Sequence, residues 1–353
     1  MKKVLHLFPR FAMGGAERLV WHYARLLSES VFQVAVGSTV EDGELRQEFE
    51  KIGVKLFVGS RQKQGGRFGV WRECQKFVRA WQPNILHTHL LGGDLFGYFL
   101  KKKFNLPWIA TLHNVEYHTS WPRRLVWKII LRRADKIIAV GEHVYNYALQ
   151  EFKLTAEKLV LIKNGIDLNP WQRVSPTSLA DSKLRLAVIG RLWEQKGHQY
   201  LLTALAQVNF PCELHIFGAG PLAPQLKQQA ENLKIDNQLT WHGVQANIPQ
   251  ALANIDVVVQ PSLWEGMSLV VMEAMAAGKL VVASPAAAQE LIQDKITGLV
   301  ASPAALASIL QWVFEHREEA RAIAAAGRKY AKNTFDIKNN VRAIEEIYKM
   351  TNN

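Results

Sequence analysis

Two series of short apolar runs, each alternating with longer amphipathic segments, most constrain how this 353-residue chain can fold. Strands separated by helices pair in parallel, and the helices then cover both faces of the sheet. In the first half we expect strands at 4–8, 33–37, 55–58, 85–87, 108–112 and 136–140, and helices at 17–27, 68–80 and 122–133. This rhythm predicts an α/β fold built on a doubly wound parallel sheet.

The second series begins near residue 184, after a segment (164–182) rich in Pro, Ser, Asn and Gly that is typical of a linker. It predicts strands at 184–190, 213–217, 239–242, 257–259 and 280–283, helices at 198–206, 222–232 and 268–277, and amphipathic helices from Ala304 onward. We therefore expect two Rossmann-like domains, at 1–168 and 169–335. A C-terminal helix, at 336–353, is expected to pack back on the first domain.

The composition is that of an ordinary globular protein, with 48% hydrophobic and 21% charged residues, which argues against a disordered, collagen-like or coiled-coil chain. Cys74 and Cys212 lie far apart in no metal-ligand pattern, as expected in a reducing compartment such as the cytoplasm. The apolar run within residues 1–10 is too short for a signal peptide.

A stretch of 19 uncharged residues, 296–314, has the length of a membrane span. It is broken by glycine, serine and proline, however. We interpret it as a strand at 297–301 and a helix that Ser302 caps and Pro303 begins. The sequence therefore predicts a soluble or at most peripheral protein.

The positive charge is concentrated in one half of the chain. Residues 1–170 hold 26 lysines and arginines against 15 acidic residues, a net +11, whereas residues 171–353 hold 17 against 16, a net +1. This excess predicts an anionic partner for the first half, which can be nucleic acid, a membrane surface or a phosphorylated substrate.

A glycine pair, Gly14-Gly15, follows the first expected strand and precedes Ala16-Glu17-Arg18 at the start of a helix. Glycines here let a phosphate approach the backbone, and the helix N-terminus supplies partial positive charge. The pair does not match the fingerprint G-x-G-x-x-G, and no acidic residue ends the second strand to hold a ribose. A phosphate site and a plain turn are both open interpretations.

The segment from Gly190 to Gly197 directly follows the first strand of the second domain and carries Arg191 and Lys196. Both cations can form charge-assisted hydrogen bonds to a diphosphate. The alternative is a surface loop with solvated charges. The position after a strand favours the binding role, because ligands of such sheets bind beyond the carboxyl ends of the strands.

Two glutamates, Glu265 and Glu273, are separated by seven residues around the start of the helix expected at 268–277. Glu273 falls within an otherwise apolar helix, where a carboxylate is costly unless it is paired or hydrogen-bonded. A pair of sugar or ribose hydroxyls would be a suitable partner. The alternative places Glu273 on the solvent face of its helix.

Histidines end two neighbouring strands of the first domain, with His87 and His89 on one and His113 after the next. Alternate strand residues point the same way, so His87 and His89 could hold a metal, but no third ligand is evident. We favour a polar lining of a cleft and expect no metal, and for His113 a core role and a cleft role stay open. The chain also lacks D-x-D, a Walker P-loop, G-x-S-x-G and H-E-x-x-H.

Seven segments, taken in order, resemble those of the retaining GT-B glycosyltransferases of the GT4 family. They are Gly14-Gly15-Ala16-Glu17-Arg18, His113, Asn164-Gly165-Ile166-Asp167, Gly190-Arg191 with Lys196-Gly197, Phe217-Gly218-Ala219-Gly220-Pro221, His242-Gly243, and Pro261-Ser262 with Glu265-Gly266 and Glu273 to Gly278. The resemblance implies a GT-B fold whose two domains face a central cleft. It places a nucleotide-sugar donor in the C-terminal domain and an acceptor in the N-terminal domain.

The resemblance also implies roles for individual residues. The implied catalytic set is His113, Glu265, Arg191 and Lys196. The implied donor site comprises Gly15, Gly190, Arg191, Lys196, Gly218, Val244, Glu265, Gly266, Met267, Ser268, Leu269 and Glu273. Gly14, Glu17 and His89 would lie near the acceptor. The implied reaction uses no metal and no cofactor, and a UDP-sugar is the expected co-substrate.

One departure follows the strand at 280–283, where the family often has a glycine-rich stretch ending in Pro-Glu. Here the chain reads Ser284-Pro285-Ala286-Ala287-Ala288-Gln289-Glu290, in which Glu290 keeps the acidic position. Two rival functions stay open. One is a phosphorylase or nucleotide-sugar epimerase on the same fold, although no cofactor lysine can be identified. The other is a basic nucleic-acid-binding protein, although no binding motif is present.

A basic amphipathic helix is expected at 120–133, where Arg124, Lys128 and Arg132 repeat every four residues and Trp121 and Trp127 add interfacial anchors. Further charge in the same domain comes from Lys101, Lys102, Lys103, Arg72, Lys76 and Arg79. We expect this domain to dock on an anionic membrane that presents a lipid-linked or lipopolysaccharide acceptor. The alternative is a core helix with solvated charges.

Overall fold

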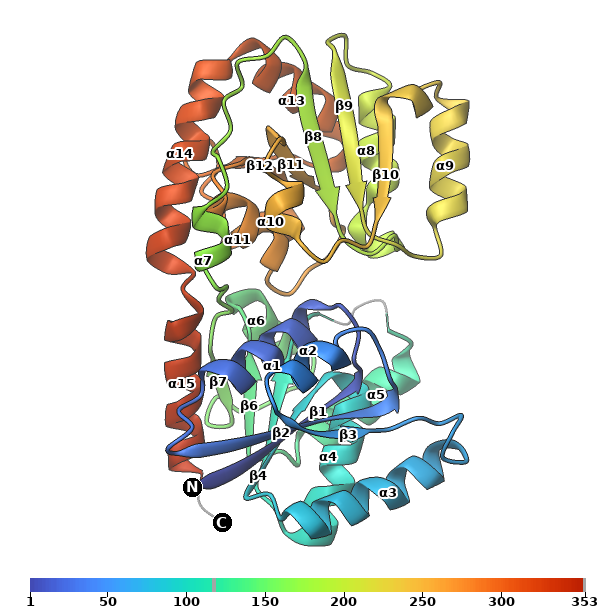
Figure 1. Ribbon diagram of the computed structural model, residues 1–353, viewed down its shortest axis with the longest axis vertical. Coiled ribbons are helices and arrows are strands. Elements are labelled where there is room, and N and C mark those ends of the chain that lie inside the picture. Colours follow the sequence, from blue (N-terminus) through green and yellow to red (C-terminus); the bar gives the residue numbers. More distant parts are fainter. Residues whose placement is uncertain (116–118, 352–353) are drawn as a thin grey trace. The chain divides into compact units, whose positions relative to one another are not determined.

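The computed structural model describes residues 1–115 and 119–351, and the chain divides into two compact units. Unit 1 consists of Met1–Asn164 and Ile337–Asn353, and unit 2 consists of Gly165–Asp336. Each unit contains one parallel sheet with helices packed on it (Figure 1). The predicted α/β fold with two doubly wound, Rossmann-like sheets is therefore confirmed.

Unit 1 is built on a seven-stranded parallel sheet with the order β3-β2-β1-β4-β5-β6-β7. Its strands are β1 (Lys2–Arg10), β2 (Phe32–Glu41), β3 (Lys55–Val58), β4 (Ile85–His89), β5 (Trp108–Leu112), β6 (Lys136–Ala139) and β7 (Leu159–Leu161). The order changes direction at β1, which pairs with β2 on one side and β4 on the other. Strands β4 and β5 are buried along their whole length, because helices cover both faces of the sheet.

The helices of unit 1 are α1 (Gly15–Leu26), α2 (Arg46–Lys51), α3 (Gly66–Trp81), α4 (Leu90–Phe104), α5 (Trp121–Leu131), α6 (Glu142–Gln150) and α15 (Ile337–Met350). Helix α4 was not expected, because its glycines are poor helix formers. Those glycines let α4 lie close to the sheet. A Cβ added at Gly93 would lie 2.4 Å from the Leu7 carbonyl oxygen, and one at Gly97 would lie 2.5 Å from Nε1 of Trp108.

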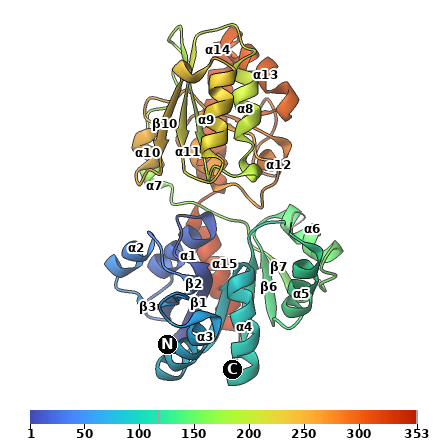
Figure 2. The ribbon, with the colours of Figure 1, turned by 90° about the vertical axis from the view of Figure 1, so that its right-hand side faces the viewer.

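The C-terminal helix α15 packs on unit 1. Ile337, Val341, Ile344 and Tyr348 recur on one helical face and are buried in a cluster with residues of β1 and α1, among them Tyr23. Figures 1 and 2 both show α15 running beside α1. The first strand also holds the end of this helix, since Nζ of Lys2 donates hydrogen bonds to the carbonyls of Tyr348, Lys349 and Thr351.

Unit 2 has a six-stranded parallel sheet with the order β10-β9-β8-β11-β12-β13. Its strands are β8 (Leu184–Ile189), β9 (Cys212–Phe217), β10 (Leu239–Gly243), β11 (Val257–Gln260), β12 (Leu280–Ala283) and β13 (Leu299–Val300). Its α-helices are α7 (Asn169–Gln172), α8 (His198–Leu205), α9 (Ala223–Asn232), α10 (Ile248–Ala251), α11 (Leu269–Ala276), α12 (Pro285–Ala288), α13 (Leu306–Glu315) and α14 (Arg317–Thr334). The order changes direction at β8, as in unit 1.

Within residues 1–115 and 119–351, no helix has the length and apolar content needed to cross a bilayer. The uncharged stretch 296–314 forms β13, a 3-10 turn at Pro303–Ala305, and most of α13. One detail of its prediction was wrong. Ser302 precedes this turn, but its side chain makes no capping hydrogen bond.

Trp127, expected as an interfacial anchor, is instead buried in unit 1. It is 3% exposed, and its Nε1 donates to Oδ2 of Asp94 at 2.7 Å. The other carboxylate oxygen of Asp94 is 2.6 Å from Oγ1 of Thr88. Asp94 is fully buried, and this burial raises its pKa to about 7. The prediction for Trp127 failed because periodicity does not reveal a buried carboxylate elsewhere in the chain.

The raised pKa of Asp94 predicts a loss of stability as the pH rises. The folded protein keeps the Asp94 proton up to about pH 7, whereas the unfolded chain releases it near its ordinary pKa of 3.8, so the free energy of unfolding falls between these values. Asp94→Asn removes this dependence. Between pH 4 and pH 8, the free energy of unfolding of the variant should therefore rise relative to that of the wild type by up to about 4 kcal/mol. Denaturant unfolding at the two pH values measures this difference. Asp135→Asn, at an exposed carboxylate paired with Lys101, is the control and should show no such gain.

Candidate functional site

A buried polar cluster lies at the carboxyl ends of β8 and β11 in unit 2. Nζ of Lys196 is 2.5 Å from Oε1 of Glu265, and the two side chains are 15% and 9% exposed. Oγ of Ser262 donates to the same carboxylate oxygen at 2.8 Å, and Nε2 of Gln260 donates to Oγ of Ser262 at 2.9 Å. Burial of both charges is thus compensated by an ion pair and hydrogen bonds.

Ser262, Gln260 and Ser284 were not predicted as site residues. Oγ of Ser284 donates to the carbonyl of Ser262 at 2.5 Å and accepts the backbone N–H of Ala287 at the start of α12. The signal that could have found them is their position, because each lies at the end of β11 or β12 or directly after it. They orient the loop that carries Glu265.

Glycines allow the loops after β8 and β9 to cross closely. Gly190 and Gly218 have φ values of +152° and +143°, which favour glycine. A Cβ at Gly218 would lie 1.9 Å from the carbonyl oxygen of Gly190, and a Cβ at Gly190 would lie 3.3 Å from carbons of the Lys196 side chain. The two glycines therefore fix the backbone next to Lys196.

Two further basic groups flank Lys196. Arg191 is exposed and lies 5.7 Å from the ring of Trp193, and no described carboxylate pairs with it. His198 is 2% exposed, and neither of its ring nitrogens has a partner among the described residues. Burial, with the nearby Lys196 charge, lowers the pKa of His198 to about 4. Arg191 and Lys196 therefore supply the positive charge here, and His198 stays neutral.

The start of α11 offers backbone amides beside Glu265. Ser268 occupies the N-cap position, but its side chain makes no capping bond, and its buried Oγ has no partner in the described part of the chain. Gly266, Met267 and Ser268 are buried, whereas Leu269 and Glu273 are half-buried. Backbone amides at a helix N-terminus suit an anionic group.

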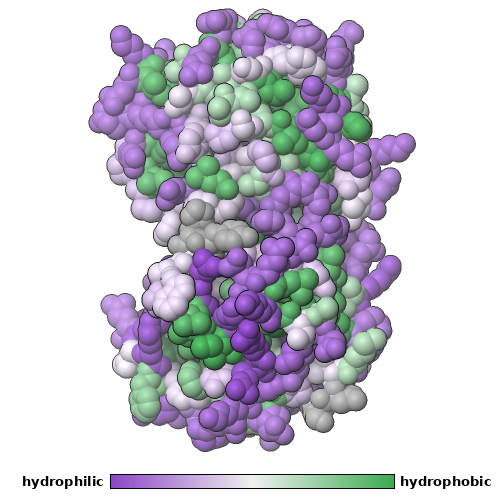
Figure 3. Space-filling view, turned by 180° about the vertical axis from the view of Figure 1, so that it is seen from behind, coloured by the Kyte–Doolittle hydropathy of each residue, from purple (hydrophilic) through white to green (hydrophobic). Residues whose placement is uncertain are grey.

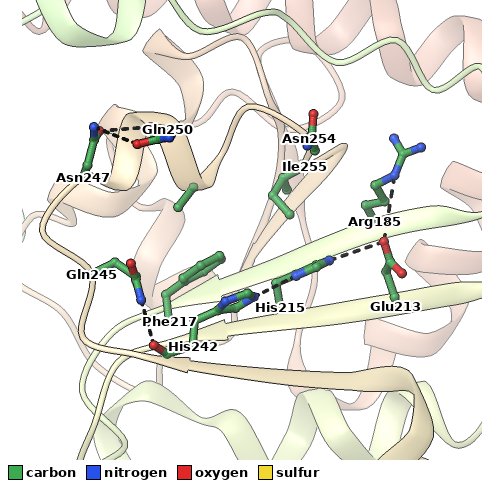
Figure 4. A pocket seen from close by; sticks show the side chains of 11 residues that line it. Arg185, Glu213, His215, Phe217, His242, Gln245, Asn247, Gln250, Asn254 and Ile255 are labelled. Carbon is green, nitrogen blue, oxygen red and sulfur yellow. Dashed lines mark hydrogen bonds and ion pairs between the residues drawn. The ribbon is translucent and has the colours of Figure 1, made fainter.

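A hollow of about 760 Å³ lies on the sheet face formed by β8, β9 and β10 (Figure 4). The rings of Phe217 and His242 are stacked at 4.5 Å, and Nδ1 of His215 is 2.9 Å from Nε2 of His242. Asn247 and Gln250 of the loop and helix α10 border the opposite side (Figure 4). The hollow adjoins Val244, which is 54% exposed just beyond β10.

The glycine turn of unit 1 lies between β1 and α1. Gly15 is exposed at the first position of α1, while Glu17 in the same turn is only 5% exposed. A Cβ at Gly14 would lie 2.3 Å from Oε2 of Glu17, so the glycine makes room for this carboxylate. The turn therefore presents open backbone with an acidic group behind it.

A chain of hydrogen bonds joins six side chains in the core of unit 1. From one end to the other these are Thr111, His87, Tyr348, His6, His89 and His113. The successive separations are 2.6, 2.5, 3.2, 3.0 and 2.9 Å. His113 is partly exposed, and the others are at most 1% exposed. His6 and Tyr348 were missed because His6 lies in a largely apolar strand and Tyr348 in an amphipathic helix, both far from His113 in sequence.

The expected role of His89 as an acceptor contact needs correction. His89 has no exposed surface, and its Nδ1 bonds to Nε2 of His113, so it can act on a ligand only through His113. His6, His87 and His89 have ligand atoms within 4.8 Å of one another, as a metal site requires. All six ring nitrogens of these residues are engaged in the hydrogen-bonded chain, however.

Comparison with protein families agrees with this division into two units. Residues 13–170 match the model of Glycosyltransferase Family 4, and residues 183–316 match that of Glycosyl transferases group 1. EpsF of Bacillus subtilis (strain 168), which is named as a glycosyltransferase, is 24% identical over 99% of this chain and 97% of its own length. The chain belongs to the family 4 glycosyltransferases, and the resemblance read from its motifs is confirmed.

Two further proteins are informative. The structure of Anabaena HepE in complex with UDP and glucose is similar with a TM-score of 0.89 and 24% identity, covering 99% of this chain and all of that one, which shows the GT-B fold. The Escherichia coli UDP-Gal:alpha-D-GlcNAc-diphosphoundecaprenol alpha-1,3-galactosyltransferase is 25% identical over 58% of each chain.

The crossing of Gly190 and Gly218 predicts a position-specific cost of adding a methyl group. Gly218→Ala drives a Cβ into the carbonyl of Gly190 and should lower the thermal unfolding temperature by several degrees. Gly243→Ala is the matched control, since its Cβ would meet no atom within 4 Å. Its only cost is that of the left-handed backbone, about 1 kcal/mol, so its fall in unfolding temperature should be smaller. Equal losses in the two variants would contradict the close crossing.

Proposed function

We propose that this glycosyltransferase moves a hexose from a nucleotide diphosphate-sugar to a hydroxyl of a glycan or glycolipid acceptor, with retention of configuration. The observation that carries the proposal is the buried Lys196–Glu265 pair at the strand ends of unit 2, beside Arg191, which pairs with no carboxylate among the described residues. This arrangement offers cations to a diphosphate and a fixed carboxylate to sugar hydroxyls. The UDP bound to HepE favours a UDP-sugar donor.

In this proposal the donor diphosphate lies against unit 2. Breaking the glycosyl–phosphate bond builds negative charge on the leaving diphosphate, and preorganised cations and amides stabilise that charge. Arg191, Lys196 and the amides at the start of α11 would serve this role without a metal ion. Glu273 would bind the ribose, and Val244 would pack against the base.

Retention follows from attack on the same face of the sugar, with a phosphate oxygen taking the acceptor's proton. Glu265 would not act as a nucleophile, because its carboxylate is engaged by Lys196 and Ser262. It would instead accept hydrogen bonds from the sugar hydroxyls. His113 would contact the donor sugar near the reacting carbon, Gly15 would let the diphosphate approach, and Glu17, beside Gly14, would lie near the acceptor.

The rival on the same fold, a phosphorylase or epimerase, would act on the donor without a glycan acceptor. Incubating the protein with a nucleotide-sugar and either inorganic phosphate or a glycan acceptor separates these reactions. Sugar transferred only to the acceptor supports the proposal. Sugar phosphate or an epimerised donor as the product would contradict it.

The donor site predicts a selective thermal shift. A UDP-sugar at 100 times its dissociation constant should stabilise the protein by about 2.7 kcal/mol, and GDP- and ADP-sugars by less. Lys196→Ala removes a buried cation and should abolish this shift and lower transfer by about one to two orders of magnitude. Lys332→Ala, at an exposed position of α14, carries the same charge change and should leave both unchanged.

For unit 1 we propose docking on an anionic membrane surface on the cytoplasmic side, where a lipid-linked acceptor of cell-surface polysaccharide or lipopolysaccharide assembly is presented. Helix α5 supports this. Trp121, Leu125, Val126 and Ile129 are 71%, 41%, 48% and 54% exposed, and Figure 3 shows apolar side chains gathered over this helix among hydrophilic ones. An exposed apolar stripe beside basic residues suits a membrane interface better than nucleic acid.

Membrane docking predicts a dependence on specific basic residues of α5 and its end. Replacing Arg123, Lys128 and Arg132 with glutamine should weaken binding to phosphatidylglycerol vesicles about a hundredfold in flotation, at about 1 kcal/mol per charge. Arg124 is left unchanged because it pairs with Glu151. The control replaces Lys227, Lys234 and Lys332 of unit 2 with glutamine. Wild-type protein that stays off anionic vesicles at every salt concentration would contradict docking.

A further inference from the structure

The hydrogen-bonded chain that ends at His113 can carry its protons in few ways. A neutral imidazole has one N–H and one bare nitrogen, so it donates on one side and accepts on the other. Each bond between two members needs one hydrogen, and the tyrosine hydroxyl also supplies one. Tyr348 is fully buried, and among the described residues its hydroxyl bonds only to His87 and His6, so its hydrogen must lie in one of these two bonds. Only two arrangements then satisfy every bond. Either all members donate toward His113, or all donate toward Thr111.

The far end of the chain distinguishes these arrangements. If all members donated toward Thr111, this hydroxyl would accept from His87 and its own hydrogen would need another acceptor. Thr111 is 1% exposed, and among the described residues its Oγ1 bonds only to His87. A buried hydroxyl hydrogen without an acceptor is costly. When Thr111 donates to His87 instead, every hydrogen within the chain is used.

We propose that this chain holds His113 as the tautomer whose hydrogen is on Nδ1, and that Tyr348 of the C-terminal helix is a positioning residue for it. Resting on the proposed function, the inference adds that His113 offers a hydrogen-bond donor, not an acceptor, to an oxygen of the bound donor sugar. In the described part of the chain, Nδ1 of His113 bonds to no other residue, and the side chain is partly exposed. The nitrogen is therefore available to a ligand.

The histidines of the chain stay neutral, as the proton count requires. Burial lowers the pKa of His6 and of His113 to about 3, and holds the pKa values of His87 and His89 well below 6.5. No described carboxylate hydrogen-bonds to any member. Neutral tautomers, and not charge states, therefore distinguish the two arrangements at physiological pH.

The same proton count applies to each histidine. Donation toward His113 places the hydrogen on Nδ1 of His87, His6 and His89 as well, because the Nε2 atom of each faces the donor in the pairs Thr111–His87, Tyr348–His6 and His6–His89. Free histidine in water prefers the Nε2–H form. Four Nδ1–H tautomers in one cluster are therefore a distinctive signature.

The tautomers can be measured by long-range proton–nitrogen NMR on the full-length protein labelled with ¹⁵N-histidine. The His113 signals are assigned by their absence in His113→Asn. We expect Nδ1–H forms at His6, His87, His89 and His113 in the wild type. An Nε2–H form at His113, or stoichiometric bound metal on His6, His87 and His89, would overturn the proposal without any need for an activity assay.

Tyr348→Phe removes the hydroxyl in the middle of the chain. We expect a mixture of tautomers at His113 and a fall in kcat of about tenfold, with a smaller change in the KM of the donor. Tyr23→Phe is the matched control, because Tyr23 is equally buried beside His6 but its hydroxyl bonds to Asn340 and not to the chain. It should leave the tautomers and kcat unchanged.

The outcomes separate the two proposals. Wild-type tautomers as expected in a protein without transfer activity would leave the chain intact and refute the proposed function. An Nε2–H form at His113 in a protein that transfers sugar would refute only the inference drawn from the chain. Unchanged tautomers and kcat in Tyr348→Phe, with folding verified by circular dichroism, would remove Tyr348 as a positioning residue.

Discussion

Parallel pairing of the strands is the constraint on which both candidate sites depend. Because all the strands of a parallel sheet point the same way, the loops after their carboxyl ends meet at one edge. In unit 2 this brings Lys196, Gly218 and Glu265, which follow three different strands, to a single edge. In unit 1 it brings the glycine turn after β1 to the edge where His89 ends β4 and His113 follows β5. Residues far apart in sequence thereby become neighbours.

The ion pair at the unit 2 edge has a consequence for ligand binding. Lys196 and Glu265 are largely removed from water, so each would be unstable there without the other. A diphosphate that approaches Lys196 would therefore join an existing pair, and its first free cationic contact would be Arg191 at the surface. The hydroxyl of Ser262 keeps Glu265 hydrogen-bonded if Lys196 turns toward phosphate. The pair thus holds a cation near the site before any ligand binds.

The sequence allowed the fold to be predicted where strands are continuous apolar runs and where helices have a clear apolar face. The prediction failed where contacts between distant residues determine whether a segment is helical or a side chain is buried. Helix α4 was missed because Gly93 and Gly97 weaken the helical signal while serving close packing on the sheet. Trp127 was misplaced because its partner, Asp94, lies 33 residues away. Among site residues, motifs assigned roles to Lys196 and Glu265, whereas no motif assigned a role to Gln260, Ser262 or Ser284, which support them.

The histidine chain was the feature least accessible from sequence, because its members come from both ends of the polypeptide. Tyr348 and His6 are separated by 342 residues and meet only when α15 packs on β1. Once they meet, the hydroxyl of Tyr348 is bonded on both sides, so the hydrogen on each ring is fixed by its neighbours. Packing of the C-terminal helix on β1 therefore also determines which ring nitrogen of His113 carries the hydrogen. The Lys196–Glu265 cluster, by contrast, is drawn from one continuous stretch of the chain, residues 196–284, and needs no contact between the two ends of the polypeptide.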